Sequence, residues 1–222
     1  MPVRDTLLAL LIVFIYGVSF VAIHAGLKEM PPLLFTGYRF LFAAVPLIFF
    51  FGRPRVSIIY VAAYGLALGT LMFGLVFSAI EIGMPAGLAS LVVQVQVFFT
   101  VLFAALLLGE TPKKHQVQGA SGAVVGIVLI GFAKSQTAPL LPVVLTVAAA
   151  ASWGVANIIS KVANAKEPFA FVVWASAFAA VPLFIGSMIL EGTKFALPED
   201  MLGWKGILAV IFTAYAATVF AY

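Results

Sequence analysis

The chain has 222 residues, of which 64% are hydrophobic and only 9% are charged, and its mean hydropathy is +1.19. Since a typical soluble domain carries about 25% charged residues, this chain cannot cover a water-facing surface, and the lipid bilayer must be its solvent. The absence of cysteine excludes disulfides and thiolate metal sites. The net charge of +4 comes from residues in short loops, so a nucleic-acid partner has no support.

Apolar runs follow one another along the whole chain. A membrane-spanning helix needs about 20 consecutive, mostly apolar residues. Runs of this kind cover 6–27, 33–51, 57–79, 84–108, 117–133, 140–163, 169–190 and 205–222. They are continuously apolar rather than alternating, which argues against barrel strands. The pattern predicts an all-α integral membrane protein, a polytopic bundle of about eight helices.

The basic residues predict how the chain is oriented. With a cytoplasmic N-terminus, the inner loops would hold Arg4, Arg53, Arg55, Lys113, Lys114, Lys161 and Lys166, and the outer loops Lys28, Lys134, Lys194 and Lys205. Cytoplasmic loops carry an excess of Lys and Arg. We therefore expect a multi-pass protein whose N-terminus is cytoplasmic.

The chain also contains an internal repeat. The six residues Phe-Ala-Ala-Val-Pro-Leu occur at 42–47 and again at 178–183. Tyr16-Gly17-Val18 likewise matches Trp153-Gly154-Val155. Helices one and two thus correspond to helices six and seven, which makes a unit of five helices. Because five is odd, the second copy enters from the opposite side, giving an inverted repeat typical of secondary transporters. Chance matching within apolar sequence is the alternative.

The repeat predicts the domain organisation. We expect residues 1–136 to form a first repeat of five transmembrane helices. Residues 137–222 would form a second, incomplete repeat of three, with the chain ending inside the eighth apolar run. Two complete repeats would contain ten helices, of which about eight are expected in this chain.

Several motifs resemble one known family. The segment Gly-Met-Pro-Ala-Gly-Leu-Ala-Ser at 83–90 opens the fourth run, and Leu-Gly-Glu at 108–110 ends it. Weaker matches are Met-Pro-Pro-Leu at 30–33, Arg39-Phe40 and the stretch from Trp153 to Asn157. Together they resemble the EamA-type members of the drug/metabolite transporter superfamily. The resemblance implies ten helices in the bacterial cell (inner) membrane, with both termini cytoplasmic and a central cavity between the repeats.

The resemblance also implies a function. The chain would be part of a secondary transporter that exports small amino-acid metabolites of the O-acetylserine and cysteine type by alternating access, without a cofactor. The alternatives are export of aromatic amino acids or drug-like metabolites, or a non-transport structural role in the membrane. An enzyme is not expected, because the spans lack a cysteine, a central acid and a His–Ser pair at catalytic spacing. The expected partners are a small-molecule substrate, the lipid bilayer and, as a further candidate, a second copy in a homodimer.

Helix four carries the densest group of polar residues. Ser90 and Gln94 are one turn apart on one face, and Gln96 shares another face with Thr100. Gln94 and Gln96 point about 200° apart, so they cannot both line one narrow cavity. We assign Gln94 and Ser90 to the substrate pathway and Gln96 to a neighbouring helix. The alternative is that both amides hold helices together.

Aromatic and polar residues at equivalent positions of the two repeats complete the candidate site. Tyr16 and Trp153 correspond through the repeat, and both lie roughly 15 Å deep, which argues against an interfacial belt. We expect them to flank the cavity, with Ser19 on the face of Tyr16. Asn157, on the face of Trp153, would bind either substrate or a neighbouring helix.

Arg39 is a basic residue within a span, about 10 Å from the outer end of helix two. It would snorkel outward, pair with Glu81 at the outer end of helix three, or attract a substrate carboxylate. We favour the pairing. Separately, glycines four residues apart predict close helix packing; they are Gly65 and Gly69, Gly83 and Gly87, and Gly122 and Gly126, with Gly119 just before the last pair.

Overall fold

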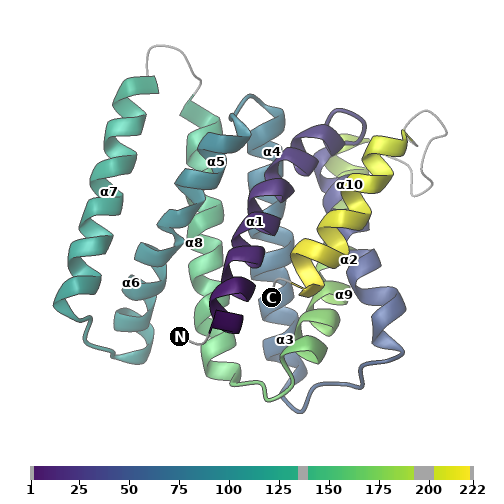
Figure 1. The fold of residues 1–222 in the computed structure, drawn as a ribbon, viewed down its shortest axis with the longest axis horizontal. Coiled ribbons are helices and arrows are strands. Elements are labelled where there is room, and N and C mark those ends of the chain that lie inside the picture. Colours follow the sequence, from purple (N-terminus) through teal and green to yellow (C-terminus); the bar gives the residue numbers. More distant parts are fainter. Residues whose placement is uncertain (1–2, 135–139, 193–202, 221–222) are drawn as a thin grey trace.

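The computed structural model describes residues 3–134, 140–192 and 203–220, and every element in these ranges is helical. The chain passes up and down the bundle as a series of long helical rods (Figure 1). They are α1 (Val3–Gly26), α2 (Pro32–Ile48), α3 (Ile58–Tyr64) continued by η1 (Gly65–Phe73) and α4 (Gly74–Glu81), α5 (Ala86–Val92) continued by η2 (Val93–Val95) and α6 (Gln96–Leu108), α7 (Lys114–Lys134), α8 (Leu140–Ala163), α9 (Pro168–Gly186) continued by η3 (Ser187–Glu191), and α10 (Trp204–Ala214) continued by η5 (Tyr215–Phe220). Each predicted span overlaps one rod, so the all-α prediction is confirmed.

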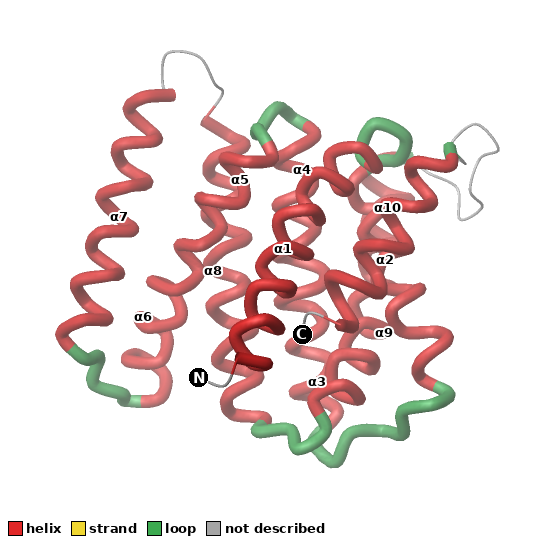
Figure 2. Tube along the Cα trace, in the orientation of Figure 1, coloured by secondary structure: helices red, strands yellow, loops and turns green. Residues whose placement is uncertain are grey.

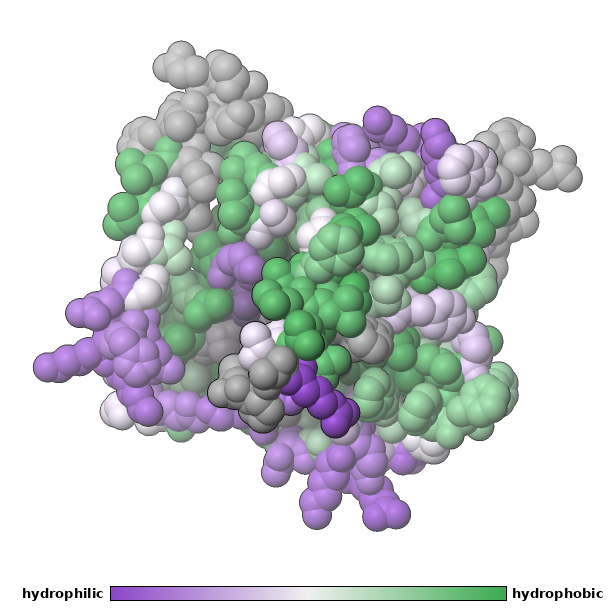
Figure 3. Space-filling model, viewed as in Figure 1, coloured by the Kyte–Doolittle hydropathy of each residue, from purple (hydrophilic) through white to green (hydrophobic). Residues whose placement is uncertain are grey.

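The distribution of polar and apolar residues is that of a membrane protein. Within the described ranges, five rods are long and apolar enough to cross a bilayer, and the helices Pro32–Ile48 and Trp204–Val219 are shorter and apolar. The loops gather at the two ends of the bundle (Figure 2). The face shown in Figure 3 has a broad apolar middle, with hydrophilic residues at its lower and upper rims. The exposed apolar side chains therefore face lipid.

Local chemistry sets the helix boundaries. Pro32 and Pro168 occupy the first turns of α2 and α9, where the missing N–H costs nothing. Gly109 and Gly192 follow the ends of α6 and η3 with φ values of 67° and 66°. Glycine adopts this left-handed conformation without a steric penalty, and it commonly terminates helices.

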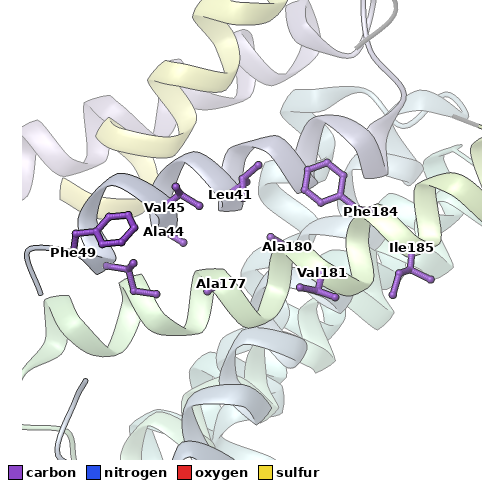
Figure 4. A pocket seen from close by; sticks show the side chains of 10 residues that line it. Leu41, Ala44, Val45, Phe49, Ala177, Ala180, Val181, Phe184 and Ile185 are labelled. Carbon is purple, nitrogen blue, oxygen red and sulfur yellow. The ribbon is translucent and has the colours of Figure 1, made fainter. Parts of the chain in front are cut away.

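The two copies of the repeated motif face each other across one seam. They lie on α2 and α9, which run antiparallel and enclose an apolar groove of about 300 Å³ (Figure 4). The groove is lined by Leu41, Ala44, Val45, Ile48 and Phe49 of α2 and by Ala177, Ala180, Val181, Phe184 and Ile185 of α9. Each α9 residue follows its α2 counterpart by 136 positions, as in 41 and 177, the same offset that separates the motif copies at 42 and 178. The seam therefore has the two-fold character that an inverted repeat predicts.

The expected boundary between the repeats lies outside the described residues. It falls at residues 136 and 137, in the range 135–139. The division into repeats of 1–136 and 137–222 stays a prediction.

Close helix packing is confirmed at the first glycine pair. A Cβ added to Gly65 would overlap the carbonyl oxygen of Ala175, and one added to Gly69 would overlap the Cβ of Ala179. The hydroxyl of Thr70 donates a hydrogen bond to the carbonyl oxygen of Ala179 at 3.2 Å. Because glycine removes the side chains from this crossing, η1 and α9 meet almost backbone to backbone.

The same prediction is wrong for the other glycines. In the described part of the chain, an added Cβ would meet no atom within 4 Å at Gly83, Gly87, Gly119, Gly122 or Gly126. These glycines lie on or beside α5 and α7, and α7 forms one edge of the bundle (Figure 1). Spacing alone does not show whether a neighbouring helix is present.

Carboxylates join segments that are distant in sequence. Glu191 accepts hydrogen bonds from the backbone N–H groups of Leu33 (2.7 Å) and Leu34 (3.1 Å). These donors belong to the first turn of α2, where the helix leaves N–H groups unsatisfied and its dipole favours an anion. Glu191 thereby ties the end of η3 to the start of α2.

Glu29 and Glu167 make similar connections at opposite ends of the bundle. Glu29, after α1, accepts a hydrogen bond from the backbone N–H of Gly206 in the first turn of α10. Glu167, before α9, lies with its Oε1 atom 3.7 Å from Nε of Arg55, which precedes α3. In both cases a carboxylate from a connection between two rods contacts the start of a third rod.

The crossing of η1 and α9 generates a stability prediction. Replacing Gly65 with Ala places a methyl group against the carbonyl of Ala175, which cannot move away without shifting α9. Overpacking of this kind costs about 1–3 kcal/mol, so the melting temperature of the purified protein should fall. The matched control is Gly87→Ala, whose new methyl group meets open space. Equal melting temperatures for the two variants would contradict the packing described here.

The Glu191 cap generates a second prediction. Glu191→Ala leaves two N–H groups of α2 without their acceptor, and losing a cap costs about 0.5–2 kcal/mol. The control is Glu81→Ala at the same end, because Glu81 is exposed and is repelled by the charge of Glu191. Thermal unfolding should show a lower midpoint for the first variant and an unchanged or higher one for the second. The reverse order would show that Glu191 does not stabilise α2.

Candidate functional site

Three polar side chains form a network between α6 and α8. The Nδ2 group of Asn157 donates hydrogen bonds to Oε1 of Gln96 (2.8 Å) and to Oγ1 of Thr100 (2.9 Å). The Thr100 hydroxyl in turn donates to the backbone carbonyl of Gln96 at 2.7 Å. The sequence left two roles open for Asn157, binding of substrate and bonding to a neighbouring helix, and these hydrogen bonds are of the second kind. A contact between Asn157 and substrate stays a prediction.

A glycine brings these two helices together. Gly154 lies three residues before Asn157, and a Cβ there would be 2.7 Å from Cβ of Phe99 and 3.1 Å from the backbone nitrogen of Thr100. The short separation lets one amide reach both partners on the facing helix. Trp153, beside this glycine, is partly buried and packs against the main apolar core.

Gln94 lies at a break in its helix. It is the central residue of η2, a single 3₁₀ turn between α5 and α6, and it is exposed, whereas Val93 and Val95 are buried. A 3₁₀ turn advances about 120° per residue, so Gln94 and Gln96 point in different directions, and it is Gln96 that accepts a hydrogen bond from Asn157. Such a turn inside a long helix often marks a hinge. The assignment of Gln94 to the pathway stays a prediction.

The two predicted serines bond to their own helices. The hydroxyl of Ser90 donates to the carbonyl of Gly87, and that of Ser19 donates to the carbonyl of Ile15, each at 2.7 Å. A hydroxyl oxygen that donates one hydrogen bond keeps the capacity to accept others. The bonds therefore orient both oxygens and leave them able to receive a donor from a ligand.

A second polar group surrounds Arg39. This side chain is only 2% exposed. Its Nε donates a hydrogen bond to Oγ1 of Thr218 in η5 at 2.9 Å, and its guanidinium carbon lies 4.0 Å from the ring centre of Phe73 in η1. Tyr16 of α1 is within electrostatic reach of Arg39, and Tyr64 of α3 is within reach of Tyr16. Four rods thus converge on one buried positive charge.

The described contacts of Arg39 involve residues other than Glu81, the partner favoured from the sequence. Glu81, at the end of α4, is exposed, and its electrostatic neighbour is Glu191. Thr218 and the ring of Phe73 instead provide the described hydrogen bond and cation–π contact of Arg39. A pairing of Arg39 with Glu81 stays a prediction.

Sequence reasoning missed Thr218 and did not assign a role to Ser152. The Ser152 hydroxyl donates to the carbonyl oxygen of Ala67 in η1 at 2.8 Å. The wider turn of this π-helical segment disturbs regular backbone hydrogen bonding, and π-helical turns are frequent at functional sites. The signal that could have identified Ser152 is the glycine-rich stretch 65–69, opposite which a hydroxyl residue on a neighbouring helix is expected.

The side chains of the candidate site suit ligand binding better than covalent chemistry. It offers neutral amides, hydroxyls, aromatic rings and one buried guanidinium. Among the residues that the structure describes, no three His, Asp or Glu side chains gather in a way that could hold a metal ion. The polar residues form two groups, one around Arg39 between α1, α2, η1 and η5, and one around Asn157 between α6 and α8.

Comparisons with known proteins place this bundle in a family. The EamA-like transporter family matches residues 5–132. The "Probable amino-acid metabolite efflux pump" of Escherichia coli strain K12 is 37% identical, over 99% of this chain and 76% of its own length. The protein of the same description from Salmonella typhimurium strain LT2 is 38% identical over the same shares. The resemblance found in the sequence motifs is therefore confirmed.

A solved crystal structure shares the fold. It is 22% identical, covers 98% of this chain and 76% of its own chain, and superposes with a TM-score of 0.63. Since outer-membrane proteins of bacteria are β-barrels, a helical bundle with these bacterial relatives is a multi-pass inner-membrane protein. It is a transporter of small molecules rather than an enzyme, and the chain belongs to the EamA-like transporter family.

Proposed function

We propose that the chain acts in a secondary transporter that exports small amino-acid metabolites by alternating access, with its N-terminus in the cytoplasm. Two relatives that match nearly the whole chain are described as amino-acid metabolite efflux pumps. The structural observation that carries the proposal is the buried guanidinium of Arg39 at the junction of four rods.

Arg39 supplies what one end of an amino acid needs. A guanidinium binds a carboxylate through two parallel hydrogen bonds, and it stays protonated at any physiological pH. An ionised group within a membrane is costly and usually marks a substrate or ion pathway. In this proposal the substrate carboxylate binds Arg39, and Tyr16 and Ser19 of α1 line the same side of the cavity.

Neutral groups would bind the rest of the substrate. The ammonium group can donate to amide and hydroxyl oxygens such as those of Gln94, Ser90 and Asn157, and the ring of Trp153 can cover the apolar part. None of these groups is charged, so the ammonium would be held weakly. Weak binding suits an exporter, because the substrate must be released on the far side.

The fold contains the features that alternating access requires. Groove residues of α2 and α9 pair at a constant offset of 136 positions, which supports two halves related as in transporters built from inverted repeats. The 3₁₀ turn at Gln94 and the π-helical segments η1 and η5 interrupt the rods near the candidate site. In this proposal the two halves of the bundle rotate relative to each other about the α2–α9 seam. The accompanying backbone changes occur at η1, η2 and η5.

Export of aromatic amino acids by the same site is the second candidate. The rings of Phe40, Phe73 and Phe77 lie around Arg39, with centroids 5.4, 4.0 and 5.9 Å from the guanidinium carbon. They would favour a substrate that has both a carboxylate and a ring. A drug-like metabolite without an anionic group would gain nothing from Arg39.

The carboxylate assignment predicts a change in selectivity. In proteoliposomes, we expect saturable flux of labelled O-acetylserine and cysteine, and much weaker flux of cysteamine, which lacks the carboxylate. Arg39→Gln should raise the KM for cysteine by about tenfold or more, because a hydrogen bond to a charged group contributes about 1.5–3 kcal/mol. The cysteamine flux of the same variant should stay at the wild-type level.

The ratio of the two fluxes separates recognition from folding. A misfolded variant would lose both, and its lower melting temperature would reveal this, so Arg39→Lys serves as a second variant that keeps the charge. An unchanged preference for cysteine over cysteamine in folded Arg39→Gln would exclude Arg39 as the carboxylate site. Preference for an aromatic amino acid in the wild type would keep the site and change the substrate.

Substitutions of Gln94 in η2 and Asn157 in α8 are predicted to have different outcomes. Gln94→Ala should lower flux without changing the melting temperature, because Gln94 is exposed. Asn157→Ala should lower both, since Gln96 and Thr100 lose their shared donor. The two variants are assayed side by side for flux and for thermal unfolding. If neither alters transport of the true substrate, the proposed site is wrong.

A further inference from the structure

A second cavity, of about 420 Å³, opens at the end of the α2–α9 seam where the basic connection between α2 and α3 lies. Unlike the apolar groove, it combines charged and aromatic residues. It is lined by Phe50, Phe51, Gly52, Arg53 and Arg55 after α2, and by Glu167, Pro168, Phe169 and Ala170 at the start of α9. None of these residues belongs to the candidate transport site.

The charges in this cavity favour an anion. Its lining includes two guanidinium groups, of Arg53 and Arg55, and one carboxylate, that of Glu167. The carboxylate engages Arg55, with Nε and Oε1 3.7 Å apart, and it also accepts a hydrogen bond from the backbone nitrogen of Arg55 at 3.4 Å. The lining therefore carries a net positive charge.

Aromatic contacts hold the connection against α9. The rings of Phe51 and Phe169 stack with their centres 6.3 Å apart, and Nε1 of Trp174 donates to the carbonyl oxygen of Phe51 at 3.2 Å. Trp residues concentrate where a membrane protein meets the headgroup region, and charged loop residues such as Arg53 and Arg55 lie there as well. The cavity is thus positioned at the level of lipid headgroups.

The basic cavity and the apolar groove are lined by neighbouring residues of the same two connected segments. Ile48 and Phe49 line the near end of the groove, and Phe50, the next residue, lines the cavity. On α9, Ala170 of the cavity and Ala177 of the groove are seven residues apart, so they lie on one face, about 10 Å from each other. Figure 4 shows the groove side chains of α2 and α9, with Phe49 at one end. A polar cavity at the end of the bundle thus lies next to an apolar groove along α2 and α9.

We propose that this seam binds one anionic phospholipid, with its phosphate at Arg53 and Arg55 and an acyl chain in the groove between α2 and α9. A soluble anion would leave the groove unused, and a zwitterionic lipid would gain little from the two arginines. Basic pockets between transmembrane helices bind anionic headgroups in this manner. Since α2 and α9 carry the two copies of the repeated motif, the lipid bridges the two halves of the bundle.

Native mass spectrometry of the detergent-purified protein tests the proposal with phosphatidylglycerol and, for comparison, phosphatidylcholine. We expect one bound phosphatidylglycerol and weaker binding of phosphatidylcholine. The double variant Arg53→Gln/Arg55→Gln should weaken phosphatidylglycerol binding by about tenfold or more, because each positive charge near an anionic lipid contributes about fivefold. Soluble glycerol 3-phosphate should not compete at millimolar concentration.

Two controls make the result specific. Lys113→Gln/Lys114→Gln removes the same charge from the start of α7 and the residue before it, and should leave lipid binding unchanged. Ala177→Phe fills the groove without changing charge and should weaken binding, whereas Val21→Phe, on the exposed side of α1, should not. Melting temperatures confirm that each variant is folded.

Three results would overturn the proposal. One is wild-type binding of phosphatidylglycerol by the double arginine variant, and another is an equal loss in the lysine control. The third is unchanged binding by Ala177→Phe, since an acyl chain could not then occupy the groove. The assay measures lipid binding alone, so its outcome does not depend on whether the chain transports amino acids.

Discussion

The backbone hydrogen bond is the interaction on which this structure depends. In hydrocarbon, no water is present to satisfy a free N–H or C=O group, so a chain of this composition must form helices. The exceptions lie inside the bundle: the carbonyl of Ala67 in η1 accepts from Ser152 of α8, and Thr70 of η1 bonds to the carbonyl of Ala179 in α9. Irregular backbone is thus found where hydroxyl groups join it to a neighbouring helix.

These irregular segments lie beside the residues that suit transport. η1 carries Phe73, whose ring contacts Arg39, and η5 carries Thr218, which accepts its hydrogen bond. Gln94 lies in the 3₁₀ turn between α5 and α6. A segment that departs from ideal geometry is easier to deform than a regular helix. The seam between α2 and α9 is formed by regular helices, so it can remain constant.

Charge is distributed so that only one described span buries a cation. Among the described residues, Arg39 is the charged side chain in the buried core, and the glutamates 29, 167 and 191 bind helix starts or an arginine at the ends of the rods. The same separation is seen along the seam, where an apolar groove between α2 and α9 lies next to a basic cavity at one end. A zwitterionic substrate and an anionic lipid would therefore use different positive charges of one bundle.

The sequence by itself determined the helices, their approximate ends and the family, because span length, proline and glycine positions and the repeated motif are local properties. It also separated Gln94 from Gln96, since helical geometry sets their angle. It did not determine which helices would be neighbours: glycines at 65 and 69 pack against α9, whereas those at 122 and 126 meet open space. Only the tertiary structure joined Asn157 to Gln96, Arg39 to Thr218 and the groove to the basic cavity. Asn157 and Gln96 are 61 residues apart in the chain, and Arg39 and Thr218 are 179 apart. No local pattern encodes which distant helix a side chain will meet.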